Sequence, residues 1–297
     1  MIAASRGPLL AVPLLLFAVG FDAAAQQPPV KLFISVDMEG IGGIGTAAMT
    51  NASGKDYALG RRLMTDEVNA VVAAAFARGP AEIVVNDSHG DMQNLLHTEL
   101  DPRVTYIQGS IKPYGMVEGL DGTFDGAIFI GYHTRAGTAG GFLAHTGSGA
   151  VKGLWINGRE AGEGDMNAAY AAAHGVPVIL LSGDSAVVEQ LAYLNAQGVT
   201  TKVAVTPVSA ALLHPEMVRE RLAVATRRAL DGIASARPPT LDEPVAVRLR
   251  FADVTTPQIL QAIPGVRQVD GYTVEFEAAT MADAYRLIRL MYRFVSV

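Results

Sequence analysis

The chain has 297 residues, of which 50% are hydrophobic and 18% are charged, and its formal net charge is −6. This composition is not that of a disordered chain, and the absence of cysteine excludes a disulfide scaffold, a thiolate zinc site, an iron–sulfur cluster and a cysteine nucleophile. Because the charge is negative and Lys and Arg do not cluster along the sequence, we expect no nucleic-acid partner.

The first 25 residues have the pattern of a secretory signal peptide. Arg6 precedes an apolar run from Pro8 to Phe21, and three alanines ending at Ala25 provide an A-x-A cleavage site. The apolar run is shorter than the roughly 20 residues that a membrane helix needs, although an uncleaved anchor is the alternative. We therefore expect an exported protein, periplasmic in a Gram-negative host, which has no contact with the membrane after cleavage.

Strands and helices alternate in the first part of the mature chain. Residues 55–78 repeat apolar side chains with the spacing of a helix, and Gly79-Pro80 is a typical helix stop. A second helix is predicted at 165–174, and apolar, β-branched runs predict strands at 31–37, 83–86, 104–108, 126–132 and 177–181. This order predicts a Rossmann-like, three-layer α/β fold, in which helices cover both faces of a mostly parallel sheet. We assign this fold to residues 26–195.

The remainder of the chain, residues 196–297, has a different pattern. A long helix is predicted from Pro215 to about residue 233, with proline in its first turn. Alternating strands at 245–251 and 272–276 follow, and an amphipathic helix begins at Met281. We therefore expect a smaller C-terminal α+β unit.

Acidic and histidine side chains directly follow three of the predicted strands. Asp37 and Glu39 come at the end of the first strand. His89 follows the strand at 83–86, and His133 follows the strand at 126–132. In an open parallel sheet the carboxyl ends of the strands lie along one edge, where ligands bind, so we expect these four side chains to converge. Glu163, which precedes a predicted helix, is a candidate to join them.

Two histidines and three carboxylates form a set of nitrogen and oxygen ligands. It suits Zn²⁺, Mn²⁺ or Co²⁺ better than Mg²⁺ or Ca²⁺, and it exceeds the four ligands of a single zinc site. The set therefore predicts two divalent ions that share one carboxylate, and such a pair activates water and polarises a carbonyl group. Without a cation, three carboxylates about 5 Å apart would repel one another by on the order of 10 kcal/mol, which is comparable to the stability of a whole domain.

Each of these residues also has a simpler interpretation. A D-x-E sequence after a strand is often a turn or a helix cap, His89 is compatible with turn chemistry, and a buried His133 can be a satisfied core histidine. His145 lies in a glycine-rich loop and is compatible with a flexible surface position. Three alternative functions remain: a two-metal phosphoesterase, for which Arg135 and Lys152 are the only basic residues nearby, a non-catalytic periplasmic peptide-binding protein, and a purely structural Rossmann-like domain.

Five segments in a fixed order form a sequence signature. They are S-V-D-M-E-G (Ser35–Gly40), V-N-D-S-H (Val85–His89), K-P-Y-G-M-V-E-G-L-D (Lys112–Asp121), G-Y-H-T-R-A (Gly131–Ala136) and I-N-G-R-E-A-G-E (Ile156–Glu163). Together they resemble the zinc-dependent bacterial D-aminopeptidases, the DppA-like metallopeptidase family, whose signature is S-x-D-x-E-G. The resemblance runs from about Lys31 to the C-terminus and is densest up to about Asp184.

This resemblance implies a role for each candidate residue. Asp37 matches the metal-bridging aspartate of the family, and the family's other zinc ligands match Glu39, His89, His133 and Glu163. His145 matches the histidine that the family assigns as catalytic, for which a nucleophilic role is proposed. Proton transfer or stabilisation of an oxyanion by this imidazole is the alternative role.

The resemblance also implies an activity and an assembly. It implies two zinc ions per subunit and removal of the N-terminal residue from short peptides or amides, with a preference for D-amino acids such as D-Ala. It further implies a ring-shaped homodecamer whose active sites face an inner cavity. Two features depart from the family: the segment A-H-T-G-S-G-A around His145 is small and glycine-rich where relatives carry bulkier residues, and the best-known relatives look cytoplasmic, without a signal peptide.

Overall fold

The computed structural model describes residues 1–4, 7, 29–79 and 81–295, and in this part of the chain the strands form two sheets. The first sheet has seven strands in the order β3-β2-β1-β4-β7-β8-β9. Their bounds are β1 Val30–Val36, β2 Ala81–Asp87, β3 Thr105–Ile107, β4 Gly126–Tyr132, β7 Val178–Asp184, β8 Gln197–Thr206 and β9 Ser209–Leu212. Neighbouring strands are parallel except β8 and β9, which are antiparallel.

The second sheet is antiparallel and has the order β11-β12-β10-β5-β6. Its strands are β5 Val151–Ile156, β6 Arg159–Ala161, β10 Val245–Phe251, β11 Arg267–Asp270 and β12 Thr273–Ala278. The α-helices are α1 Tyr57–Arg78, α2 Glu163–Ala173, α3 Ser185–Gln190, α4 Pro215–Asp231, α5 Thr255–Leu260 and α6 Met281–Leu290.

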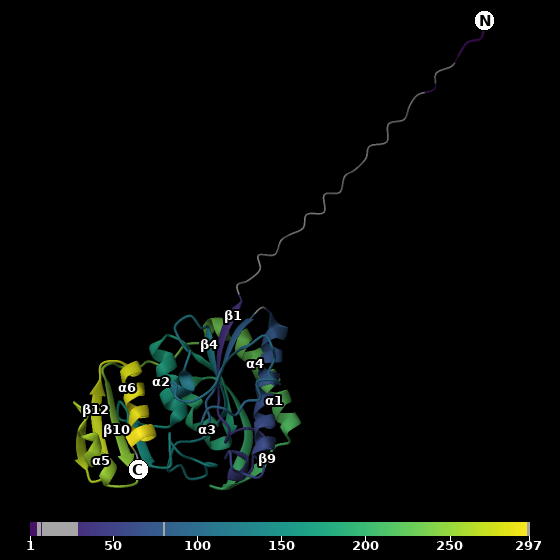
Figure 1. Ribbon diagram of the computed structural model, residues 1–297. Helices are drawn as coiled ribbons and strands as arrows, with labels where there is room; N and C mark the ends of the chain where they lie inside the picture. The colour runs from purple at the N-terminus through teal and green to yellow at the C-terminus, as the bar shows by residue number, and fades with distance from the viewer. Residues whose placement is uncertain (5–6, 8–28, 80, 296–297) are drawn as a thin grey trace.

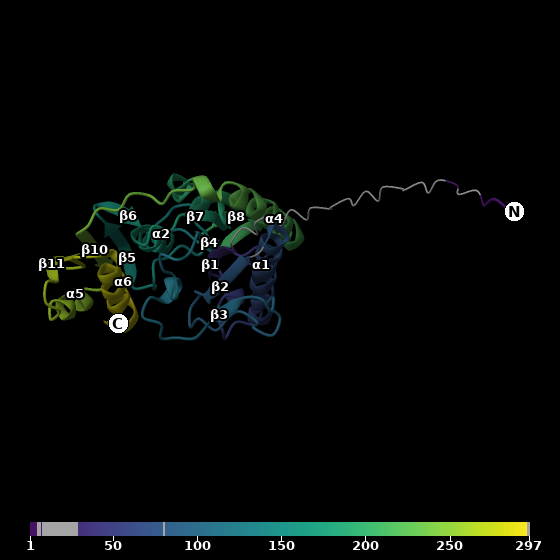
Figure 2. The same cartoon turned by 90° about the horizontal axis from the view of Figure 1, so that it is seen from above.

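The side chains of β1 alternate between the two faces of the first sheet. Leu32 and Ile34 are fully buried in a core that includes Val68 of α1 and Leu222 of α4. Phe33 belongs to the core on the opposite face, which α2 covers. This alternation follows from the two-residue period of a strand and places a layer of helix on each face. The predicted three-layer α/β fold is confirmed (Figures 1 and 2).

The second sheet shares a core with the first. Phe33 and Phe129 of the first sheet lie in the same buried cluster as Met166 of α2, Leu249 of β10 and Tyr285 of α6. In Figure 1, α6 and the antiparallel sheet lie beside α2, on the side away from α1 and α4. The antiparallel strands and the last two helices therefore form the smaller α+β unit, and it packs directly on the first.

The division between the two sheets does not follow the expected boundary after residue 195. β8 and β9 extend the first sheet and α4 covers it, although all three come after that point. Conversely, β5 and β6 come before it but pair with β10 in the second sheet. The reason is that no local sequence pattern shows which distant strands pair with each other, because strand formation depends on tertiary context.

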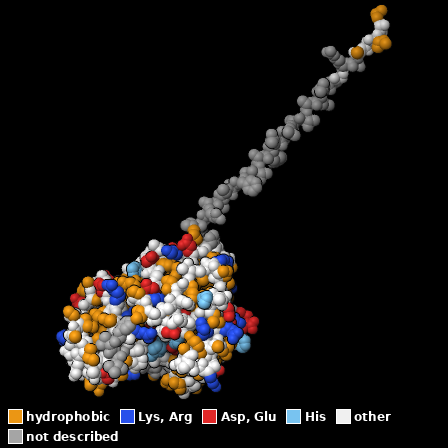
Figure 3. Space-filling view, viewed as in Figure 1, with side chains coloured by type: hydrophobic (Ala, Val, Ile, Leu, Met, Phe, Trp, Pro, Cys, Tyr) orange, Lys and Arg blue, Asp and Glu red, His pale blue; other side chains and the backbone are white. Residues whose placement is uncertain are grey.

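The apolar run of the expected signal peptide, together with its cleavage site at Ala25, lies outside the described residues. Within the described ranges, no helix combines the length and apolar composition that crossing a bilayer requires. On the face of the molecule shown in Figure 3, Lys and Arg side chains are dispersed among Asp, Glu and apolar side chains.

The carboxyl ends of β1, β2 and β4 lie side by side at one edge of the first sheet. In the parallel register, Val36 is opposite Asp87 of β2 and Ile130 of β4. The loops that follow these three strands therefore begin next to one another. They carry the residues that the sequence singled out.

Candidate metal centre

The loop that follows β1 lies directly against the end of β4. The amide of Gly40 donates a hydrogen bond of 2.8 Å to the carbonyl of Gly131. A Cβ on residue 40 would overlap the carbonyl oxygen of Tyr132, so glycine is required for this close approach. The contact places Asp37, which is 2% exposed, beside His133, the residue after β4.

One oxygen of Asp37 faces His89 and Glu39. The Nδ1 atom of His89 lies 3.2 Å from Asp37 Oδ1 and 3.1 Å from Glu39 Oε2. Both carboxylates are buried. The first group of candidate ligands therefore combines residues from the β1 and β2 loops.

The other oxygen of Asp37 faces His133 and Glu163. The Nε2 atom of His133 lies 3.3 Å from Asp37 Oδ2 and 3.5 Å from Glu163 Oε2. Glu163 is the first residue of α2, and its Oε1 accepts a hydrogen bond of 2.5 Å from the amide of Gly147. Asp37 is thus shared between two groups, each with one histidine and one glutamate, as expected for a carboxylate that lies between two cations.

Backbone carbonyls select the tautomers of the two histidines. The Nε2 atom of His89 donates to the carbonyl of Thr50 at 2.8 Å, and the Nδ1 atom of His133 donates to that of Thr134 at 2.9 Å. In each neutral ring the opposite nitrogen, which faces Asp37, therefore presents a lone pair. Hydrogen bonds of this kind are typical behind histidines that bind metals.

The centre contains buried polar atoms that have no hydrogen-bond partner. Asp37 Oδ2 and His133 Nε2 are two such atoms. Burial raises the pKa of Asp37, and the charge of Glu39 adds to this effect. Burial alone would lower the pKa of His133, but Glu163 and Asp37 raise it well above its usual range. The carboxylates thus attract positive charge, and the unpartnered atoms suit a divalent cation that takes nitrogen and oxygen ligands.

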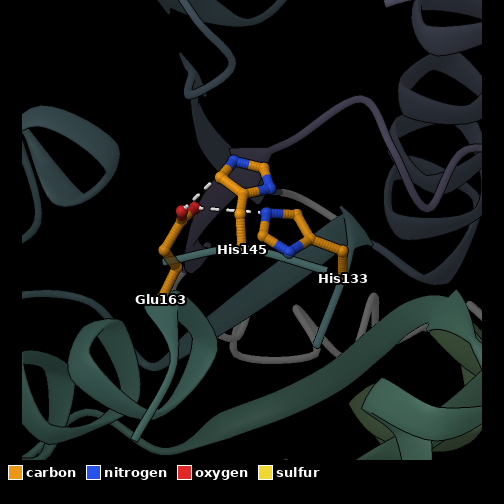
Figure 4. Close-up of side chains that lie close together, drawn as sticks. All are labelled: His133, His145 and Glu163. Carbon is orange, nitrogen blue, oxygen red and sulfur yellow. Dashed lines mark ion pairs between the residues drawn. The ribbon is translucent and has the colours of Figure 1, made fainter. Parts of the chain in front are cut away.

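His145 lies at the edge of the same cluster. Its ring stacks on that of His133 with centroids 4.0 Å apart, and its Nε2 is 3.7 Å from Glu163 Oε1 (Figure 4). Its Nδ1 donates to the carbonyl of Leu143 at 2.9 Å, so Nε2 presents the lone pair of the neutral ring. At 32% side-chain exposure, His145 is more accessible than His89 or His133. It therefore combines contact with the cluster and access to a substrate.

The structure brings together all six side chains that the sequence singled out, which are Asp37, Glu39, His89, His133, His145 and Glu163. The other histidines lie elsewhere: His97 is exposed in a loop, His174 follows the last residue of α2, and His214 precedes α4. Of the two basic residues that a phosphoesterase could use for phosphate, Arg135 forms an ion pair of 2.8 Å with Glu160, and the exposed Lys152 donates a hydrogen bond of 2.8 Å to the carbonyl of Gly149.

Two buried charged residues behind the centre were missed by the sequence analysis. Lys202 of β8 donates hydrogen bonds to the carbonyls of Glu39 at 2.5 Å and Ile44 at 2.7 Å. Glu67 of α1 accepts one of 2.6 Å from the amide of Gly42. Together they hold the backbone of the loop that carries Glu39. For Glu67, the only sequence signal was a charged residue on the face of α1 that the helical pattern predicts to be buried. No local sequence pattern indicated Lys202.

Glu67 makes stability depend on pH. Burial raises its pKa to about 7; Lys202 and Arg219 oppose this effect, and Asp66 adds to it. The protonated carboxyl therefore stabilises the fold below the ordinary value of 4.5, and this contribution is lost as the pH rises through about 7. Glu67→Gln keeps an acceptor for Gly42 but does not ionise. We compare the free energy of unfolding of Glu67→Gln with that of the native chain. We expect the difference to shift in favour of the variant by about 2 kcal/mol between pH 5.5 and pH 8.

Urea unfolding of the two zinc-loaded proteins at both pH values measures this difference, because the pH dependence of zinc binding is common to both. The control is Glu82→Gln, which changes an exposed carboxyl on β2 and should leave the pH dependence as it is. If the free energies of unfolding of Glu67→Gln and the native chain change by the same amount between the two pH values, then ionisation of Glu67 does not oppose folding.

Three comparisons with known proteins bear on this centre. The profile of the peptidase M55 family, described as D-aminopeptidase, matches residues 30–290. The chain is 35% identical over 265 residues to a D-aminopeptidase of Bacillus subtilis (strain 168), a match that covers 88% of this chain and 96% of that protein. Its fold is similar, with a TM-score of 0.87 and 34% identity, to the solved structure of the Zn-dependent D-aminopeptidase DppA from Bacillus subtilis, a self-compartmentalizing protease; this match covers 90% of the present chain and 98% of the other.

Proposed function

The chain belongs to the peptidase M55 family of D-aminopeptidases, and on this basis we propose that it is a zinc-dependent aminopeptidase. It removes the N-terminal residue of short peptides or amides and prefers D-amino acids such as D-Ala. The preference rests on the names of the relatives. The metal ligands themselves do not distinguish D from L residues, because stereochemical preference depends on the walls of the pocket.

The observation that carries this proposal is the shared position of Asp37. Its two oxygens face different pairs of one histidine and one glutamate, an arrangement that supports two cations sharing one carboxylate. Asp37 would hold both zinc ions, together with Glu39 and His89 for one and with His133 and Glu163 for the other. Mn²⁺ and Co²⁺ suit the same donor atoms.

The roles of the side chains in hydrolysis follow from their positions. When bound, two divalent ions polarise the scissile carbonyl and lower the pKa of a water molecule. The three carboxylates, Asp37, Glu39 and Glu163, hold this positive charge in place, and two ions against three carboxylates leave a net charge that favours a developing oxyanion. His145 takes up at Nε2 the proton that the attacking water loses and delivers it to the leaving amine. Its hydrogen bond to Leu143 keeps Nε2 toward the reacting groups.

Removal and return of zinc test the proposed activity. The purified protein is dialysed against a chelator and assayed with D-Ala-D-Ala, L-Ala-L-Ala and an aryl phosphate. We expect the native protein to hydrolyse D-Ala-D-Ala fastest, to lose this activity with its zinc, and to regain it when zinc is added back. Hydrolysis of the phosphate ester alone would instead identify a phosphoesterase, and tight peptide binding without turnover would identify a binding protein.

We also propose that the protein forms a homo-oligomer, a decamer like that implied for the family. Two facts support this. The solved relative is self-compartmentalizing, and exposed apolar side chains gather on the β8–β9 hairpin, at Val203, Val205, Val208 and Leu212. Such side chains favour burial against another copy. Light scattering on the protein as it elutes from a size-exclusion column measures the mass of the assembly. The mass of a monomer would contradict the proposal.

We propose further that the protein is exported and acts in the periplasm on envelope peptides that contain D-Ala. The support is the N-terminal sequence alone, with its apolar run and its alanine-rich exit. If this is right, the protein isolated from its host begins at Gln26. An N-terminus at Met1 would contradict cleavage.

A further inference from the structure

A cavity of about 100 Å³ opens beside the metal centre, and its walls come from opposite ends of the chain. Asp37, His89, His145 and Glu163 line one part of it, and Arg289 lines another. The substrate of an aminopeptidase must place its first peptide bond next to the ligands, so this cavity is where the rest of a short peptide lies. The sequence analysis did not connect Arg289 with the site, because nothing in the pattern of a C-terminal helix indicates what its residues face.

Arg289 is an unusual residue for such a wall. It lies on α6 and is only 4% exposed. Its guanidinium packs against Gly115, where a Cβ would overlap it. It donates a hydrogen bond to the side chain of Tyr292, which also lines the cavity. These contacts hold the guanidinium in position, but both partners are neutral.

In the part of the chain that the structure describes, no carboxylate pairs with this charge, and none of the ion pairs within 4.0 Å includes Arg289. Buried charges in proteins are usually paired, because an unpaired one is costly to remove from water. A buried guanidinium that lines a substrate cavity and has no paired carboxylate among the described residues is therefore arranged for an anion of the ligand. Its planar set of donors matches the two oxygens of a carboxylate.

We propose that Arg289 binds the free α-carboxylate of the substrate and thereby makes the protein selective for very short peptides with a free carboxyl end. This inference rests on the proposed aminopeptidase function. Two extended residues span at most about 7 Å, so a dipeptide whose amino end lies at the metal ligands carries its carboxylate across a small cavity. Arg293, which is exposed and also lines the cavity, adds positive charge to its lining.

The test compares two substrates that differ only in the group in question, D-Ala-D-Ala and D-Ala-D-Ala-amide, with the zinc-loaded protein. We expect the native protein to have a kcat/KM at least about 10-fold higher for the free acid, since a charge-assisted hydrogen bond of this kind is worth about 10- to 100-fold. Arg289→Gln should bring the ratio of the two kcat/KM values close to one, mainly through KM for the free acid. Arg289→Lys keeps the charge but loses the paired donors, so it should restore the ratio only in part.

The matched control is Arg286→Gln on the same helix. Arg286 is 55% exposed, forms an ion pair with Asp283 and does not line the cavity, so its loss should leave the ratio as it is. Equal rates of the native protein on the two substrates would overturn the role of Arg289, and this result needs no variant to fold. An equal loss on both substrates in Arg289→Gln would also overturn it. If neither peptide is hydrolysed, the proposed function fails, and calorimetric binding of the same two peptides still decides whether Arg289 recognises the carboxylate.

Discussion

Replacement of Asp37 by asparagine should abolish hydrolysis of D-Ala peptides and release both zinc ions. Each oxygen of Asp37 faces one of the two ligand groups, at 3.2 Å from His89 and 3.3 Å from His133. An amide nitrogen is a poor metal ligand, and the change also removes one of the three negative charges. Because the loss of residues that merely support metal ligands already costs about 10- to 100-fold, we expect kcat/KM to fall by more than about 100-fold. Elemental analysis after dialysis, beside the D-Ala-D-Ala assay, measures both effects.

Asp165→Asn is the matched control for this change. Asp165 is also buried and is only two residues from Glu163, but its carboxylate accepts hydrogen bonds from the amide of Gly162 and from Gln190 instead of facing the centre. This variant should keep both zinc ions and most of its activity. If Asp37→Asn kept two zinc ions per chain and full turnover, then Asp37 would not bridge the metals.

Replacement of His145 by alanine should leave zinc bound and remove turnover. His145 contacts the ligand cluster only at its edge, with Nε2 3.7 Å from Glu163, and it is more exposed than the other two histidines of the centre. The loss of a residue that transfers protons lowers kcat by about 100- to 10,000-fold. The zinc content, measured on the same sample, should stay at two ions per chain.

Two results would change the role of His145. Loss of one zinc ion in the variant would make it a ligand, which its distance from Glu163 and His133 also allows. A trapped acyl-imidazole intermediate in the native protein would make it a nucleophile. His97→Ala, which removes an exposed histidine outside the centre, controls for the loss of an imidazole as such.

The central elements of the fold were predictable because their signals are local. The strand predicted at 126–132 is β4, and the helix predicted at 55–78 is α1, which begins two residues later and ends at the same residue before Gly79. By contrast, β8 and β9 were not predicted. They form one edge of the first sheet, and β8 carries the exposed Val203 and Val205, so they lack the continuous apolar run of a strand covered on both faces. Their membership of the first sheet is a tertiary property.

The candidate site was predictable for a related reason. Asp37, His89 and His133 each follow a strand of one parallel sheet, and the geometry of such a sheet brings the ends of neighbouring strands together without any knowledge of side-chain contacts. The residues that support the site could not be predicted in this way. Lys202 and Arg289 reach it from a sheet edge and from the C-terminal helix, and only the packing of distant elements places them there.

Anomalous diffraction at the zinc absorption edge, from crystals of the protein grown with zinc, tests the two-metal centre most directly. We expect two peaks per chain that share Asp37: one beside Glu39 and His89, and the other beside His133 and Glu163. A single peak, or peaks bound to residues outside this set, would contradict a pair of cations bridged by Asp37.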